Sequence, residues 1–378
     1  MNDSIWQLAK NVQSITAVRL LAASAGVNAA KRGIGSVIVI GVDGVSYDVA
    51  EALHLSGTLH SLRSVFPTTS VTAFLSSILG IGPEFHGIWG PVLRIESSTN
   101  DDSVVNLLRS RRYRWGDDWV TGGTPLNGTE LNIRNQGSLF HDWQSADLKP
   151  IAISAEYPGM SKEWLDAIHL GAVRIVDPTP AAMMSVEPLA HTQIVIGIVR
   201  DVIAPMNAVW AHINLDPYIH LHGYDAQIAA AISYIDDMCC DFAAQGIPSM
   251  WYADHGMMRT KVLECDRLLW EQLETPLWCR GRAGGAGRTR WLYPHARFEG
   301  HVLKMLLDGL GTDAIVIHRD ELGSLGLLEG MAEPISLRVG EVVAIATGER
   351  FPIPDPNLIF EHGGISEQER RIPLVIYG

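Results

Sequence analysis

Six side chains of the kinds that bind metal ions follow short apolar runs or lie in glycine-containing loops of this sequence. They are Asp43, Asp216, His220, Asp254, His255 and His362. Imidazole and carboxylate together suit zinc, whereas magnesium prefers sites built mostly from oxygen. Two ions about 4 Å apart can hold the attacking and leaving oxygens of an in-line displacement. The residue types therefore indicate a two-ion centre, with zinc as the expected metal.

Taken singly, most of these residues also have an ordinary structural explanation. An aspartate after a strand is often a turn former, and a His-Gly pair usually marks a turn. Asp254-His255 is the stronger signal, because two adjacent ligand types at the end of a buried strand must be coordinated or solvated. In residues 216–223, His222 competes with His220, and spacing alone leaves that choice open.

A hydroxyl-rich segment supplies a candidate nucleophile. Phe66-Pro-Thr-Thr-Ser70 ends an extended segment and opens a helix predicted to run from Ser70 to Leu79, before Gly80. The positive potential at a helix N-terminus favours both an alkoxide and an incoming phosphoryl oxygen. Serine and threonine are also the preferred helix caps, so the local sequence fits a nucleophile and a plain cap alike.

The elements that must position these residues alternate between strands and helices. Residues 36–42, 208–215 and 248–253 are apolar runs typical of buried parallel strands, and each leads directly to one of the three aspartates. A helix is expected over residues 225–244. In open α/β sheets, ligands bind at the carboxyl ends of the strands. We therefore expect a three-layer αβα fold, a doubly wound and mostly parallel sheet that carries the site at one edge.

The predicted organisation has three parts: an N-terminal helical segment (1–35), a metal-binding core (36–260 and 350–378) and a small inserted α+β cap module (261–349). In the cap, residues 280–290 form a glycine-rich basic stretch that lacks phosphate-loop spacing and is predicted to be a mobile loop. Aromatic and basic cap residues either recognise the leaving group or pack the core of the cap itself; they are Trp278, Arg290, Trp291 and Tyr293.

Composition limits the partners. A net charge of −13 argues against a nucleic-acid polymer, and no apolar run is long enough to cross a membrane. Asp3 and Arg19 make the N-terminus a poor secretory signal. The four cysteines show no CxxC spacing, which favours free thiols and a cytoplasmic location.

The order of the motifs resembles the alkaline phosphatase superfamily, specifically its nucleotide pyrophosphatase and type I phosphodiesterase branch. The resemblance covers residues 36–260 and 350–378. It is carried by Val42-Asp-Gly44, Phe66-Pro-Thr-Thr-Ser70, His86-Gly-Ile88, Asp216 to Gly223, Asp254-His-Gly-Met257 and His362-Gly363.

This resemblance implies roles for individual residues. One ion would be held by Asp216, His220 and His362, which selects His220 over His222. The other would be held by Asp43, Asp254, His255 and the oxygen of Ser70, the implied nucleophile of a phosphoryl-serine mechanism. His86 has a structural role in this scheme.

The expected function is hydrolysis of phosphodiester or pyrophosphate bonds in a small anionic, nucleotide-linked substrate. The alternatives are a phosphomonoesterase or a phosphonate or sulfate ester hydrolase, and, outside enzymes, a catalytically silent metal-binding interaction protein. Two departures from the family pattern bear on the choice between these functions. Family diesterases commonly use threonine where this chain has Ser70. Several also place an asparagine after the His-Gly motif to contact a phosphoryl oxygen, where this chain has Ile88-Trp-Gly-Pro91, so that contact is missing or supplied elsewhere.

Overall fold

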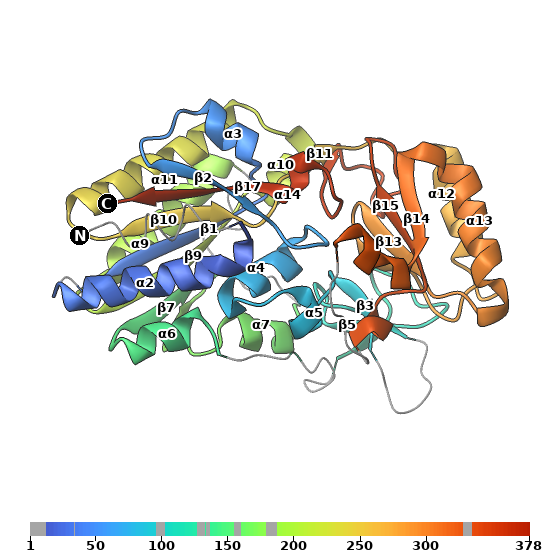
Figure 1. Ribbon diagram of the computed structural model, residues 1–378, viewed down its shortest axis with the longest axis horizontal. Coiled ribbons are helices and arrows are strands. Elements are labelled where there is room, and N and C mark those ends of the chain that lie inside the picture. The colour runs from blue at the N-terminus through green and yellow to red at the C-terminus, as the bar shows by residue number, and fades with distance from the viewer. Residues whose placement is uncertain are drawn as a thin grey trace.

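The protein is described by a computed structural model that covers residues 13–33, 35–95, 103–126, 133, 137–154, 160–178, 187–327 and 335–378. Two β-sheets stand next to each other, and each carries its own helices (Figure 1). The sheet that contains both the first and the last long strand of the chain is called the central sheet below. No helix among the described residues is long and apolar enough to span a bilayer.

The central sheet is mostly parallel, as predicted. Strands β10, β1, β9, β7 and β8 run parallel, whereas β17 is antiparallel to both of its neighbours. In spatial order the strands are β2 (Thr58–Arg63), β17 (Arg371–Tyr377), β10 (Ser249–Ala253), β1 (Val37–Asp43), β9 (Asn207–Asn214), β7 (Lys149–Ile153) and β8 (Arg174–Val176). Because β1 is buried along its whole length, it needs the uninterrupted apolar run seen in the sequence.

Helices cover both faces of this sheet and make the three layers (Figure 1). One layer contains α2 (Val18–Lys31), α4 (Ser70–Leu79), α6 (Leu139–Ser145) and α7 (Lys162–Ile168); the other contains α9 (Pro188–Val202) and α11 (Ala226–Ala244). The Asp225 side chain caps α11 by accepting hydrogen bonds from two backbone N–H groups. Gly80 ends α4 in the left-handed conformation, with φ of 68°. Of the N-terminal helical segment predicted over residues 1–35, residues 18–31 form α2, and residues 1–12 and 34 lie outside the described part of the chain.

The second sheet draws strands from two distant parts of the sequence. Its spatial order is β14 (Ala314–His318), β15 (Val342–Ala346), β13 (Thr289–Leu292), β12 (Gly284–Ala286), β3 (Val92–Arg94), β4 (Val104–Asn106), β5 (Arg111–Tyr113) and β6 (Thr124–Pro125). Residues 92–125 fall within the predicted core (36–260), but strands β3, β4, β5 and β6 complete the sheet of the cap. Strands of two or three residues are too short to show an alternating pattern, which explains the difference.

The glycine-rich stretch at 280–290 is not the mobile loop that we predicted. It forms most of the β12–β13 hairpin, and a Cβ atom added to Gly284 would lie 2.2 Å from the Trp291 ring. Glycine is therefore needed there for close packing. Helices α12 (Glu264–Leu273) and α13 (Glu299–Leu310) pack on one face of this sheet (Figure 1).

The remaining described helices and strands are short. They are η1 (Ile15–Ala17), α3 (Tyr47–Ala52), α5 (Pro83–His86), α10 (Asp216–His222), β11 (Met258–Arg259), η2 (Ala296–Phe298), η3 (Gly311–Asp313), η4 (Arg319–Leu325), η5 (Ile335–Arg338), β16 (Phe360–Glu361) and α14 (Glu367–Arg370). The pair β11 and β16 forms a two-stranded sheet of its own.

Candidate metal centre

The six predicted ligands meet at the carboxyl edge of the central sheet. Asp43 is the last residue of β1, and Asp254 follows the last residue of β10, the strand beside it. Gly44 has φ of 84°, and this turn directs its N–H to Asp254 Oδ1 at 3.0 Å. Asp216 begins α10, two residues after β9 ends. The strand ends thus gather the three carboxylates, as the sequence predicts.

Three of the ligands form a buried group, called the inner trio: Asp43, Asp254 and His255. One ligand atom from each lies within 4.8 Å of the others. His255 Nε2 is 3.1 Å from Asp254 Oδ2 and 3.6 Å from Asp43 Oδ1. The three side chains are at most 3% exposed. Such a site is shielded from solvent and has its geometry fixed by two adjacent strands.

The other three ligands form the outer trio: Asp216, His220 and His362, again with one ligand atom each within 4.8 Å. His220 Nε2 is 3.0 Å from Asp216 Oδ2, and His362 Nε2 is 3.6 Å from Asp216 Oδ1. These side chains are 11–17% exposed. His222 belongs to neither trio: it is exposed, and its ring lies against Tyr218 with centroids 4.4 Å apart.

All three histidines are oriented in the same way. Each donates its Nδ1–H to a backbone carbonyl: His220 to Phe360 at 2.7 Å, His255 to Gly256 at 3.2 Å and His362 to Thr68 at 2.9 Å. This arrangement leaves the Nε2 lone pair of each ring facing the carboxylates of its trio. A second hydrogen bond that fixes the tautomer and the ring orientation is typical of metal-binding histidines.

Ser70 lies with the inner trio. Its Oγ is 3.1 Å from Asp43 Oδ1 and 3.1 Å from His255 Nε2. The ring of His255 in turn stacks on the ring of His362, with centroids 3.9 Å apart. Because Ser70 is the first residue of α4, its hydroxyl is also at the positive end of that helix.

Burial and neighbouring charges shift the pKa values of four side chains of the two trios. Burial and the neighbouring Asp43 raise the pKa of Asp254 well above its ordinary value. Burial lowers the pKa of His255, and burial together with His255 lowers the pKa of His362 well below the usual range. For His220, burial is outweighed by Asp216 and Glu361, which raise its pKa to about 10.

Unsatisfied carboxylate oxygens indicate that the two trios fit cations. Among the described residues, Asp216 Oδ1 and Asp254 Oδ2 are buried and have no hydrogen-bond partner. Each belongs to a different trio. A buried carboxylate oxygen without a donor is costly, and a coordinated cation removes that cost. Mixed nitrogen and oxygen donors at low coordination number suit zinc.

The loop that carries His362 is held by both halves of the molecule. From the central part, the Thr68 hydroxyl accepts from Gly363 N at 3.0 Å. From the second sheet, Arg288 N donates to His362 O at 2.8 Å, and the Thr289 hydroxyl donates to Gly363 O at 2.6 Å. The second sheet therefore helps to position a ligand of the outer trio.

A fully buried ion pair supports the same loop. Arg288 Nε donates to Glu369 Oε1 at 3.0 Å, and that oxygen also accepts from Gly364 N at 2.7 Å. Both charged side chains are 0% exposed. Since a buried ion pair that loses one partner is strongly destabilising, this pair ties the hairpin to the ligand loop.

Three polar residues near the centre were missed in the sequence. His212 Nε2 is 3.4 Å from Asp43 Oδ2, Asn214 is paired in register with Asp43, and Glu361 Oε1 is 3.5 Å from His362 Nε2. Burial raises the pKa of Glu361 to about 7. For two of them a signal was present: His212 and Asn214 are polar residues in the otherwise apolar stretch 208–215.

His86 is buried away from both trios, in agreement with its expected structural role. Its Nε2 is 2.9 Å from the Ser76 hydroxyl, and its Nδ1 accepts from Ile88 N at 3.1 Å. Burial, with a smaller contribution from the Arg338 charge, lowers the pKa of His86 to about 3.

The aromatic residues of the cap mainly pack its interior. Trp291 and Tyr293 are each 1% exposed, and Trp278 stacks on His301 with centroids 5.0 Å apart. The guanidinium of Arg290 lies 4.1 Å from the centroid of the Trp270 ring in α12. Of the two roles considered for these residues, the structure favours packing.

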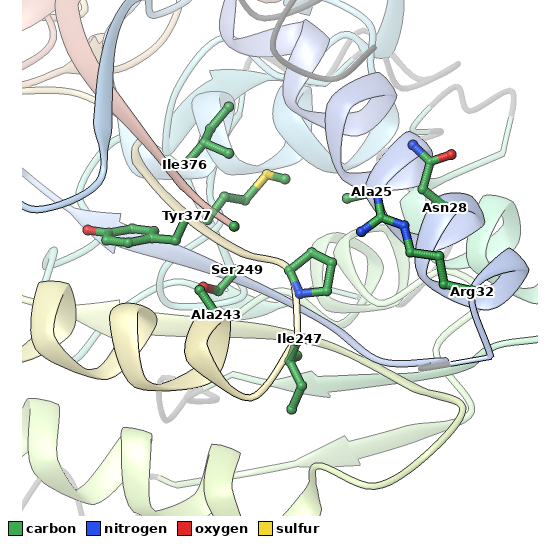
Figure 2. A pocket seen from close by; sticks show the side chains of 12 residues that line it. Ala25, Asn28, Arg32, Ala243, Ile247, Ser249, Ile376 and Tyr377 are labelled. Carbon is green, nitrogen blue, oxygen red and sulfur yellow. The ribbon is translucent and has the colours of Figure 1, made fainter. Parts of the chain in front are cut away.

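Two cavities lie away from the trios. One, of about 240 Å³, is at the opposite edge of the central sheet, where Asn28 of α2 and Arg32, just after that helix, face Ile376 and Tyr377 (Figure 2). A larger one, of about 1030 Å³, is lined by Arg290 and residues of α12. Arg290 is directed toward α12 while the adjacent Thr289 bonds the His362 loop, so this cavity and the centre are on opposite faces of the second sheet.

Comparison with known proteins gives structural relatives only, because no family profile and no curated protein sequence matches the chain. Murine ectonucleotide pyrophosphatase/phosphodiesterase 5 is similar with a TM-score of 0.61 and 16% identity, covering 90% of this chain and 88% of that chain. Phosphonoacetate hydrolase from Sinorhizobium meliloti 1021 is similar with a TM-score of 0.59 and 16% identity, covering 90% and 89%. At such identities the likeness establishes the fold.

That fold is the alkaline phosphatase-like fold. Human ectonucleotide pyrophosphatase/phosphodiesterase 5 gives the same result, with a TM-score of 0.60 at 13% identity over 90% of this chain and 87% of that chain. The resemblance that we drew from the ordered motifs is confirmed at the level of the fold, and the fold class predicted from the sequence is confirmed with it.

Proposed function

We propose that this protein is a metal-dependent hydrolase of phosphoric esters with two zinc ions, one in each trio. One observation carries the proposal: six side chains that are spread over more than 300 residues of sequence form two ligand groups, and the Ser70 hydroxyl touches the inner one. Structural relatives support the class, since one is named a pyrophosphatase/phosphodiesterase and another was solved with phosphonoacetate.

In the proposed reaction, Ser70 is the nucleophile. Its oxygen attacks phosphorus in line with the leaving alcohol, a phosphoryl-serine forms, and the alcohol takes up the proton that Ser70 loses. Water then attacks the phosphoryl-serine and restores the hydroxyl. Bound zinc would supply the positive charge that lowers the pKa of the hydroxyl and neutralises the phosphoryl oxygens. The N-terminus of α4 adds a favourable potential at the same atom.

For the substrate we propose a phosphodiester or pyrophosphate bond in a small anionic, nucleotide-linked molecule. The murine relative was also solved, as an inactive variant, in complex with AMP, which supports a nucleotide-sized ligand on this fold. The serine at position 70 favours the second candidate, a phosphomonoesterase, because monoesterases of the superfamily resembled by this chain more often use serine.

The test compares two chromogenic substrates with the zinc-reconstituted protein: bis(4-nitrophenyl) phosphate and 4-nitrophenyl phosphate. A higher kcat/KM for the diester supports the leading candidate, and a higher value for the monoester supports the second. Protein treated with a chelator and then returned to zinc is the control, and it should lose and regain activity. Absence of turnover of both esters by the two-zinc protein would contradict the proposed function.

A further inference from the structure

Strand β9 places two polar side chains beside the inner trio. Asn214 is paired in register with Asp43, and His212 is paired with Gly41, on the side of β1 away from β10. Paired residues of parallel neighbours point to the same face of a sheet. The 3.4 Å distance from His212 Nε2 to Asp43 Oδ2 shows that β9 presents these residues on the Asp43 face. Asn214 is therefore a direct neighbour of Asp43.

The position of α4 shows that Asn214 is level with Ser70. The Phe74 ring packs on His212, with centroids 4.8 Å apart, and a Cβ atom on Gly41 would lie 2.7 Å from the same ring. From His212 to Asn214 the strand advances about 7 Å toward the carboxyl edge. From Phe74 back to Ser70 the helix covers about 6 Å in the same direction. Asn214 thus faces the turn of α4 that begins with the nucleophile.

The amide of Asn214 has an unsatisfied buried atom. Its Oδ1 has no hydrogen-bond partner among the described residues. An unpaired buried polar atom is costly, which makes it a marker of a ligand position when it borders a site. A half-turn about the Cβ–Cγ bond exchanges the oxygen and the two N–H donors of the amide, so the same position can present either.

We propose that Asn214 binds the substrate by donating an amide N–H to a non-bridging oxygen of the phosphoryl group held at Ser70. The inference rests on the proposed function and extends it. Among the described residues, the ion pairs of Asp43, Asp216 and Asp254 are all with histidines. Asn214 would add an uncharged hydrogen-bond donor beside these carboxylates. A donor aimed at the developing charge contributes more to the transition state than to ground-state binding.

The experiment uses the full-length, zinc-loaded chain and two variants of nearly equal size. Asn214→Leu removes the donors, and Asn214→Asp replaces them with a negative charge. Orthophosphate binding is measured by calorimetry, and kcat/KM is measured with the better nitrophenyl ester. We expect Asn214→Leu to weaken phosphate binding about tenfold and to lower kcat/KM about 100-fold, mostly through kcat. Zinc content should stay at two per chain.

The aspartate variant separates substrate contact from a structural role. Asp is closer to Asn in shape than Leu is, so a packing role predicts a milder effect of Asn214→Asp. Contact with an anion predicts the opposite, because a carboxylate repels phosphate. Asn28→Leu, at the opposite edge of the sheet (Figure 2), is the matched control and should behave like the wild type.

The outcomes distinguish this inference from the proposed function. If the wild type binds phosphate or turns over an ester and both Asn214 variants match it, the inference is wrong and the proposed function stands. If Asn214→Leu is impaired but Asn214→Asp is not, Asn214 has a packing role and the inference is likewise wrong. If the two-zinc wild type neither binds phosphate nor hydrolyses an ester, the proposed function fails first.

Discussion

The inner and outer trios use the same kinds of ligand, but different parts of the molecule position them. Asp43 and Asp254 of the inner trio end two adjacent strands, and His255 is the next residue along the chain. The outer trio combines Asp216 and His220 of α10 with His362 from a distant loop that the second sheet holds. One trio is thus built into the central sheet, and the other is assembled from separate segments.

The two trios also differ in how exposed their side chains are and in the pKa values of those side chains. The inner side chains are at most 3% exposed, and burial keeps the pKa of Asp254 high. In the outer trio His220 and Asp216 favour each other's charged forms, so the pKa of His220 is raised to about 10. The two sites should therefore differ in lability: the outer ion should exchange faster and depend on the cap, whereas the inner ion should be tied to the nucleophile.

The largest effect should come from Ser70→Ala, which removes an atom that contacts only the inner trio. We expect ester hydrolysis to fall at least about 10³-fold, because the nucleophile of the covalent step is gone. Zinc content should remain near two per chain, measured by elemental analysis beside the kinetic assay. Ser77→Ala, a buried hydroxyl of the same helix bonded to Phe74 O and Tyr252, is the control for helix packing. Unchanged turnover in Ser70→Ala would refute the covalent mechanism.

The next largest effect should come from replacing one carboxylate of each trio. Asp254→Asn and Asp216→Asn should each reduce the zinc stoichiometry from two to one, since each removes an anionic ligand from one site only. A competing chromophoric chelator should then take the remaining zinc more slowly from Asp216→Asn, which keeps the buried inner site. Equal rates of zinc loss from the two variants would contradict the expected difference in lability between the trios.

A smaller effect should follow from removing a hydrogen bond between the second sheet and the loop that carries His362. Thr289→Val deletes the 2.6 Å hydrogen bond to Gly363 O with little change in volume. Loss of such an outer contact typically weakens metal affinity about 10- to 100-fold, and here it should act on one of the two ions. Zinc titration of the metal-free variant would show it. Thr347→Val, whose hydroxyl bonds Thr312 O at 2.8 Å in the same part of the chain, should not change either affinity.

The smallest effect concerns a histidine outside both trios. The pKa of His86 is about 3 in the folded protein, so below pH 6.5 the unfolded chain takes up a proton that the folded chain does not. Stability is therefore lost as pH falls from about 6.5 toward 3, and the cost at pH 5.5 is about 1 kcal/mol. Denaturant unfolding of His86→Gln should show a correspondingly weaker pH dependence between pH 7 and 5.5. An identical pH dependence would contradict this account of His86.

Those parts of the structure with long, regular patterns could be predicted from the sequence. The apolar run before Asp43 gives a buried strand and its carboxyl end, and the segment from Ser70 to Gly80 gives α4 and its capping glycine. The composition of the second sheet could not be predicted. Its strands are two to five residues long, and β12 is two glycines and an alanine, which pair as a strand because glycine allows Trp291 to pack closely.

The residues of the candidate site also divide into those that the sequence predicts and those that it does not. The grouping of the candidate ligands could be predicted because aspartate and histidine follow strand ends or lie in glycine-containing loops, and the structure brings those residues together. The roles of Thr289 and Asn214 could not, because they depend on which strands become neighbours. Register between β1 and β9 places Asn214 beside Asp43, although the two residues are far apart in the sequence.

The most direct test of the two-trio account is anomalous diffraction at the zinc absorption edge from crystals of the zinc-loaded protein. The account predicts two peaks, one among Asp43, Asp254 and His255 beside the Ser70 oxygen, and one among Asp216, His220 and His362. A single peak, or zinc bound away from these residues, would contradict it.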